Sequence, residues 1–260
     1  MIKGKKKALI VLSLVTILSL GATSAWAMTG QEVIDEVKDR YGNFDSQVVT
    51  LTTQCFEGEK QINERKIVLV SQNVGDLTRS VLQFQSPADV KGVGLLDQGD
   101  DQMYMYLPEF HKVRRIAGSA KNGSFMGTDF TYNDLSLINY DSSDYQSELI
   151  KEDNQFYHLE LIDKDQAEAD YAKLLMFVRK NDFFPTRVEF YAKDTGKLKK
   201  VLTAYDLTDY GKYKLPQKLV MEDLTTQHKT VIYLTDPEFD RQLDKDTFSE
   251  RNLRRSRLRY

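Results

Sequence analysis

The chain has 260 residues, 41% of them hydrophobic, and this apolar content is enough for one substantial core. Its formal net charge is −3, and a mildly acidic surface disfavours nucleic acid as the main partner. The length would allow two domains, but the composition marks no linker. We therefore expect one all-β domain, since such domains often reach this size.

Residues 1–27 have the pattern of a secretory signal peptide. Four lysines precede an apolar run at positions 8–20, and Ala25-Trp26-Ala27 is a small-x-small site, so we expect cleavage after Ala27. A retained anchor is the alternative, but the run is shorter than the about 20 apolar residues of a membrane-spanning helix. The mature chain then has 32 basic and 39 acidic residues, a net charge of −7. The pattern predicts export to the periplasm as a soluble protein.

A short amphipathic helix is expected next. Thr29 can cap it, Val33, Ile34 and Val37 recur at helical spacing, and Gly42 ends it. Its apolar side must lie against something. The sequence leaves open whether the helix packs on a sheet face or covers an open cavity.

From residue 46 onward the pattern is typical of antiparallel strands separated by turns. We expect roughly a dozen strands, at 47–55, 62–71, 77–85, 90–96, 102–107, 112–116, 146–152, 156–162, 174–179, 185–191, 198–207, 217–223 and 229–234. An open twisted sheet of that size curls or splits, and Gly92 and Gly94 within a strand favour strong bending. A two-layer sandwich without a cavity is the alternative.

Residues 102–135 carry the most unusual pattern. The strand 102–107 is apolar on both faces, and Pro108 ends it. The loop after the basic strand 112–116 contains three glycines, yet also Phe125, Met126 and Phe130, which are costly to leave in water. Such a loop is typical of a lid or a cavity mouth. The same side chains would equally serve to plug the protein's own core.

This region also carries a family resemblance. The segments VKGVGLL, YLPEFHKVRRI and NGSFMGTDFTYNDL resemble the outer-membrane lipoprotein-sorting family, the LolA/LolB-like carriers, in particular a branch with an Arg-Arg-Ile strand and a Phe-Met-Gly loop. The resemblance covers residues 31–252. It implies a mainly β, incomplete antiparallel β-barrel with helices acting as a lid over an apolar cavity that holds acyl chains. The expected divisions are a signal peptide at 1–27, a lipid-binding domain at 28–252 and a basic C-terminal tail at 253–260.

As partners, the resemblance implies the acyl chains of a lipoprotein or lipid, an inner-membrane transporter and an outer-membrane acceptor; the protein is expected to be a monomer. Methionine and aromatic side chains suit an adaptable apolar surface. The candidate lipid-binding residues are Met103, Tyr104, Met105, Tyr106, Phe125, Met126 and Phe130. If they form a binding site, Phe125→Asp or Met126→Asp weakens lipid binding more than folding. Equal loss of both would make them core residues.

Arg114 and Arg115 are candidate headgroup ligands. Neighbouring strand residues point to opposite faces, so at most one of them can look into a pocket, where its planar fork would suit a phosphate or carboxylate. The alternative is a pair of surface charges on an edge strand, which hinders edge-to-edge aggregation.

Catalytic and metal-binding patterns are missing from the sequence. The three histidines lie far apart without metal-ligand spacing, and Cys55 is the only cysteine, which excludes an internal disulfide. Nucleophile-elbow, phosphate-loop and dinucleotide motifs are absent. We therefore expect no metal, no cofactor and no catalysis. The alternative function is a periplasmic interaction module serving an inner-membrane exporter; a hydrolase would need a polar triad in the cavity. The arginine-rich C-terminus is expected to be a solvated tail.

Overall fold

The computed structural model describes residues 28–75, 77–135, 145–165, 167 and 169–260. The predicted signal peptide lies outside the described residues. Within these ranges, no helix has both the length and the apolar character needed to cross a bilayer.

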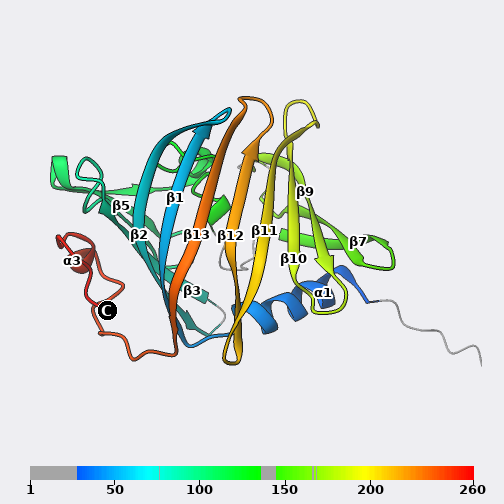
Figure 1. Ribbon diagram of the computed structural model, residues 1–260, viewed down its shortest axis with the longest axis horizontal. Helices are drawn as coiled ribbons and strands as arrows, with labels where there is room; N and C mark the ends of the chain where they lie inside the picture. Colours follow the sequence, from blue (N-terminus) through cyan, green and yellow to red (C-terminus); the bar gives the residue numbers. More distant parts are fainter. Residues whose placement is uncertain (1–27, 76, 136–144, 166, 168) are drawn as a thin grey trace, which may run out of the picture.

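The fold is dominated by a single antiparallel sheet (Figure 1). Its strands are β1 (Ser46–Glu57), β2 (Lys60–Val74), β3 (Leu77–Ser86), β4 (Gly94–Asp97), β5 (Met103–Leu107), β6 (Lys112–Ile116), β7 (Tyr145–Glu152), β8 (Phe156–Asp163), β9 (Tyr171–Arg179), β10 (Pro185–Ala192), β11 (Leu198–Tyr210), β12 (Tyr213–Asp223) and β13 (His228–Phe239). The described residues form 13 strands in the order β6-β5-β4-β3-β2-β1-β13-β12-β11-β10-β9-β8-β7.

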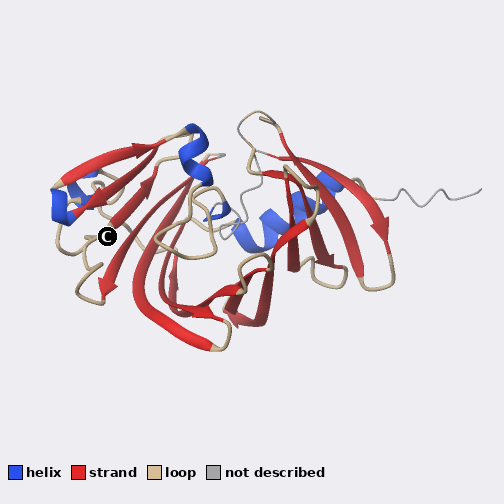
Figure 2. Cartoon of the chain, turned by 90° about the horizontal axis from the view of Figure 1, so that it is seen from above, coloured by secondary structure: helices blue, strands red, loops and turns tan. Residues whose placement is uncertain are grey.

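The sheet does not close, because β6 and β7 remain its two edges. Figure 2 shows that it bends strongly along its length. Register shifts within the pairs of β1 with β2, β1 with β13 and β2 with β3 are irregularities of the kind that increase twist and bending. The predicted mainly β fold with an incomplete antiparallel barrel is thus confirmed. The sandwich alternative is wrong, since the described strands form one sheet.

One expected strand is shorter than the sequence indicated. Residues 90–93 belong to a turn, in which Gly92 has a φ of +83°, and the strand begins only at Gly94. At Gly94 a side chain has no room, because a Cβ atom there would lie 2.6 Å from Cδ1 of Leu253. Gly94 thus permits a close approach of the C-terminal segment rather than a bend.

The predicted N-terminal helix is confirmed as α1 (Gly30–Val37), which continues as a π-helical turn, Lys38–Gly42. Thr29 and Glu32 form a reciprocal capping box at its start. The buried side chains Val33, Ile34 and Val37 join the main apolar cluster of the sheet. In Figure 2, α1 lies inside the bend of the sheet, and it contacts β7 and β8. We call this side of the sheet the inner face.

The C-terminus is not a solvated tail, and this expectation was wrong. Leu253, at the end of α3 (Glu250–Leu253), is 0% exposed and Leu258 is 5% exposed. Both belong to a second apolar cluster on the outer face of the sheet, opposite the inner face. The buried side-chain amide of Gln83 donates to the carbonyl of Arg255 at 2.8 Å, and its oxygen accepts from the backbone of Leu258 at 3.1 Å. The two buried leucines and the hydrogen bonds of Gln83 hold the C-terminal segment on the sheet, although most of its other residues are arginines.

Candidate functional site

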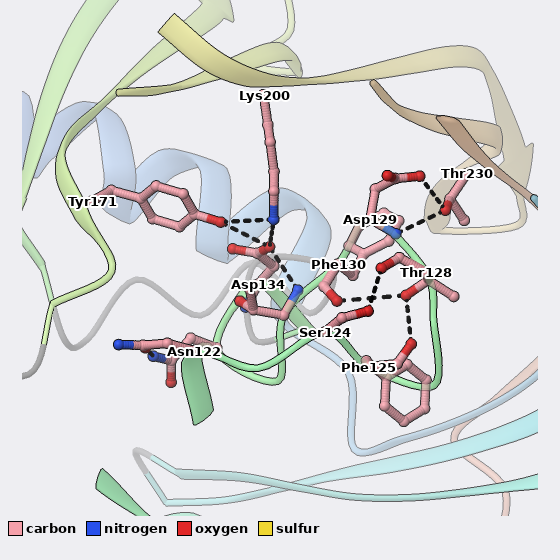
Figure 3. Close-up of polar contacts among 12 residues, drawn as sticks. Asn122, Ser124, Phe125, Thr128, Asp129, Phe130, Asp134, Tyr171, Lys200 and Thr230 are labelled. Carbon is pink, nitrogen blue, oxygen red and sulfur yellow. Dashed lines mark hydrogen bonds and ion pairs between the residues drawn. The ribbon is translucent and has the colours of Figure 1, made fainter. Parts of the chain in front are cut away.

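After β6 the chain turns to the inner face and forms a small hairpin. The 3₁₀ turn Gly118–Asn122 comes first, and an isolated bridge then joins Ser124 to Thr131. At the tip, Met126 and Gly127 have φ values of +52° and +74°, a left-handed conformation that glycine adopts without steric cost. We call residues 124–131 the inner hairpin; its polar contacts are drawn in Figure 3.

Two phenylalanines of the inner hairpin fill the inside of the curved sheet. Phe125 is 4% exposed and Phe130 is 1% exposed, and both belong to the main apolar cluster. The ring of Phe125 lies 5.8 Å from that of Phe84 on β3 and 5.5 Å from that of Tyr132. Full burial of a phenylalanine contributes about 1.5–3 kcal/mol. Apolar contact is therefore the main force that holds the inner hairpin in place.

A carboxylate fixes the hairpin to β13. Nδ1 of His228 lies 2.8 Å from both oxygens of Asp129, and the hydroxyl of Thr230 donates to the same carboxylate at 2.6 Å. The backbone N–H of Asp129 in turn donates to Thr230 Oγ1 at 2.9 Å, as Figure 3 shows. On the other side, the guanidinium of Arg65 on β2 donates to the carbonyl of Met126. The hairpin thus bridges two non-adjacent strands of the sheet.

A second buried polar cluster follows the hairpin. Asp134 accepts from the backbone of Thr131 at 2.8 Å and from the hydroxyl of Tyr171 on β9 at 3.2 Å. The ammonium of Lys200 on β11 lies 3.5 Å from the Asp134 carboxylate and donates to Tyr171 at 3.1 Å. Burial raises the pKa of Asp134, and Lys200 acts in the opposite direction. Burial also raises the pKa of Tyr171, so its hydroxyl stays protonated as a donor.

Solved structures match most of the chain. A candidate outer membrane lipoprotein-sorting protein domain from Vibrio parahaemolyticus is 29% identical, with a TM-score of 0.77 over 87% of this chain and 98% of that one. A DUF1329 family protein from Desulfovibrio piger is 25% identical, with a TM-score of 0.76 over 86% and 98%. A LolA superfamily protein from Nitrosomonas europaea, at 21% identity, shares the fold with a TM-score of 0.72 over 86% and 99%.

A family model described only as "-like: Uncharacterized protein" matches residues 76–255, more than half of the chain. This match places the chain in a family, and the solved structures show its fold. The chain belongs to the family that this model describes, and it has the LolA-like fold of the solved structures. The resemblance to outer-membrane lipoprotein-sorting proteins, predicted from the Arg-Arg-Ile and Phe-Met-Gly segments, is thereby confirmed, while the particular branch remains a prediction. No curated protein matches the sequence of this LolA-like chain.

The LolA-like fold brings together only part of the predicted lipid site. Met103 and Met105 lie buried on the inner face, where the hydroxyl of Tyr132 contacts the sulfur of Met105 at 3.3 Å. They share the main cluster with Phe125, Met126 and Phe130, of which only Met126 is half-buried. Tyr104 and Tyr106, in contrast, pack into the outer cluster beside Leu253. Alternation along β5 separates them from the methionines.

The two arginines of the predicted headgroup site lie on the edge strand β6. Arg114 pairs with Met105 and Arg115 with Tyr104, so the two point to opposite faces as expected. Both are exposed, and Arg115 forms an ion pair with Asp101 at 3.3 Å. This position agrees with charges that protect a sheet edge.

No local pattern in the sequence marks the polar anchors of this LolA-like site. Asp129 and His228 are 99 residues apart, and no motif joins them. Their arrangement is not that of a nucleophilic triad, in which the hydroxyl bonds to the imidazole. Here Thr230 and His228 both bond to the same carboxylate, so the Thr230 hydroxyl is not bonded to the imidazole as a triad nucleophile would be. Across the described residues, no group of three or more His, Cys, Asp or Glu side chains is placed to hold a metal ion.

Proposed function

We propose that this LolA-like protein is a periplasmic carrier that shelters acyl chains of a lipoprotein or lipid at its inner face, without catalysis. The observation that supports this most is the covering of the apolar inner face by α1 and the inner hairpin, in place of a second sheet. The proposed location rests on the signal-peptide pattern of residues 1–27. We propose residues 28–252 as the lipid-binding domain, followed by the C-terminal segment 253–260.

In this proposal, an acyl chain takes the place of the two hairpin phenylalanines. Each buried methylene contributes about 0.8 kcal/mol, so a long chain offsets the burial lost by two rings, about 1.5–3 kcal/mol each. Met103 and Met105 remain on the wall, where flexible thioethers adapt to different chains. Loading from an inner-membrane transporter and release to an outer-membrane acceptor then depend on relative affinity alone.

Met126→Asp is expected to lower the affinity of the mature monomer for palmitate by about tenfold, because an acyl chain beside the new carboxylate leaves it poorly hydrated. Folding should change little, since Met126 is only half-buried and its left-handed backbone suits aspartate. Fluorescent fatty-acid displacement and urea unfolding measure the two effects separately.

Phe110→Asp is the matched control, because Phe110 is 52% exposed. It should leave both properties unchanged. Phe125→Asp is expected to lose stability together with binding, since its ring is buried in the main cluster. A Met126→Asp variant with wild-type affinity would contradict acyl-chain binding beside the inner hairpin.

The direct test of cargo is native mass spectrometry of the mature protein, purified without detergent from its own periplasm and followed by organic extraction. A co-purifying diacyl lipid or acylated peptide is expected. An empty protein that also fails to take up a fluorescent fatty acid would overturn the carrier function.

The second candidate is an interaction module that serves an inner-membrane exporter. The burial of Phe125 and Phe130 favours it, because the inner face is then already filled by the protein's own side chains. In that case neither the wild-type protein nor any variant should take up fatty acid. Met126→Asp should instead weaken the complex with the exporter.

A further inference from the structure

The inner hairpin covers a polar patch that is bordered by apolar residues of the inner face. The patch comprises Arg65 and Asn63 on β2 with His228 and Thr230 on β13. Strand β1 lies between them: Cys55 pairs with Asn63 on one side and with Thr230 on the other. The four side chains thus lie in neighbouring rows across three adjacent strands.

Apolar residues border this patch directly. In the next row, Thr53 of β1 pairs with Arg65 on one side and with buried Ile232 on the other. The guanidinium of Arg65 lies 5.8 Å from the ring centre of Phe84, which is itself in the main cluster. A ligand on the inner face would therefore meet a polar end and an apolar wall side by side.

One anion already occupies the patch, and it belongs to the hairpin. The carboxylate of Asp129 is hydrogen-bonded to the imidazole of His228 and accepts a hydrogen bond from the hydroxyl of Thr230. Arg65 instead donates to a neutral carbonyl and forms no ion pair with any described residue. Oδ1 of Asn63 is buried without a hydrogen-bond partner, but as an acceptor it does not favour an anion. His228 and Thr230 thus already bond to an anion, while Arg65, the strongest donor of the patch, has no anionic partner among the described residues.

We propose that the patch of Arg65, His228 and Thr230 binds the anionic headgroup, a phosphate or a carboxylate, of an acylated ligand. The inner hairpin is then an internal stand-in for that ligand: Phe125 and Phe130 occupy the place of the acyl chains, and Asp129 occupies the place of the headgroup. This inference rests on the proposed carrier function and names the class of its cargo.

The exchange is favourable for a simple electrostatic reason. A ligand anion replaces the bonds that Asp129 makes to His228 and Thr230, and it adds an ion pair with Arg65 that the hairpin does not provide. The planar fork of arginine suits phosphate and carboxylate oxygens, and charge-assisted hydrogen bonds are about twice as strong as neutral ones. An uncharged acylated ligand forms neither the ion pair with Arg65 nor the charge-assisted hydrogen bonds, and it leaves the donors of the patch without a partner.

The test compares three ligands with one palmitoyl chain each: palmitate, palmitoyl lysophosphatidylglycerol and monopalmitoylglycerol. Binding to the mature chain is measured by calorimetry at low ionic strength, since salt screens exposed charges. Both anionic ligands are expected to bind at least about tenfold more tightly than the neutral one. A preference for only one anionic ligand identifies a carboxylate or a phosphate as the headgroup.

Arg65→Gln is expected to remove this preference. It also removes the bond to the Met126 carbonyl that holds the hairpin, so binding of monopalmitoylglycerol should not weaken. Lys66→Gln is the matched control, because Lys66 is the next residue of β2, exposed and on the opposite face. Thermal unfolding of each variant is measured first. If Arg65→Gln unfolds, Arg65→Lys, which retains the charge but not the fork, replaces it and should retain part of the preference.

Asp129→Asn tests the stand-in role independently. Loss of the carboxylate loosens the hairpin, so all three ligands should bind severalfold more tightly, with their ratio unchanged. Equal affinity of wild type for anionic and neutral ligands, or an equal effect of Arg65→Gln and Lys66→Gln, would overturn the headgroup site and leave the carrier function standing. Failure of all three ligands to bind would overturn the carrier function itself.

Discussion

Lys200→Met is expected to lower the free energy of unfolding by about 3–5 kcal/mol, because it leaves the Asp134 carboxylate buried without its cation. The methionine keeps most of the side-chain volume, so the effect reports the charge and not a cavity. Chemical denaturation at neutral pH measures it.

This loss should depend on pH in a defined direction. Burial already raises the pKa of Asp134 above its ordinary 3.8, and removal of Lys200 raises it further. Between the ordinary value and the raised one, the folded state binds a proton that the unfolded chain releases, so stability falls as pH rises. The deficit of Lys200→Met relative to wild type should therefore be largest at neutral pH and should shrink as the solution becomes acidic.

The control is the double variant Lys200→Met with Asp134→Asn, which removes both charges. Replacement of both members of a buried pair is often close to neutral. It should recover most of the lost stability and show little pH dependence. A single variant as stable as wild type at neutral pH would mean that the buried ammonium does not compensate the Asp134 charge.

Leu253→Ala is expected to destabilise the protein by about 2–5 kcal/mol, the range for a fully buried leucine. Leu253 contacts the backbone surface that Gly94 leaves free, so its removal opens a cavity that the sheet cannot close. Thermal unfolding measures the shift. Arg254→Ala, next in sequence and exposed beyond the helix, should stay within about 0.5 kcal/mol of wild type. Equal, small effects of both substitutions would restore the solvated tail that the sequence suggested.

The sequence predicts well those features whose signal is local. The alternation of β-branched and polar residues places the strands, and the spacing of Val33, Ile34 and Val37 places α1. The two-sided apolar strand Met103–Leu107 does meet an apolar cluster on each face. Sequence could not say which face carries the hairpin, because both sides of that strand look alike. For this reason the predicted lipid-binding set contained Tyr104 and Tyr106 together with Met103 and Met105.

Features that depend on long-range partners were not predictable in this way. Lys200 looks like a solvated strand residue, and its burial becomes visible only when register brings Tyr171 and Asp134 beside it. The same holds for His228, which gains its partner from a loop, and for Gln83, which gains its partners from the C-terminus. Single polar residues carry no periodic signal, so propensity and pattern assign them to the surface.

The two unpaired edges of the sheet bear on which sizes of cargo the proposed carrier could take. In a closed barrel, strand number and shear together fix the radius, and a wider interior requires hydrogen bonds to break. Here β6 and β7 never meet, so the sheet can uncoil or tighten by small changes of twist spread over many strands while every ladder stays intact. In the proposed carrier, we therefore expect the inner volume to change with the curvature of the sheet, so that ligands of different girth can fit.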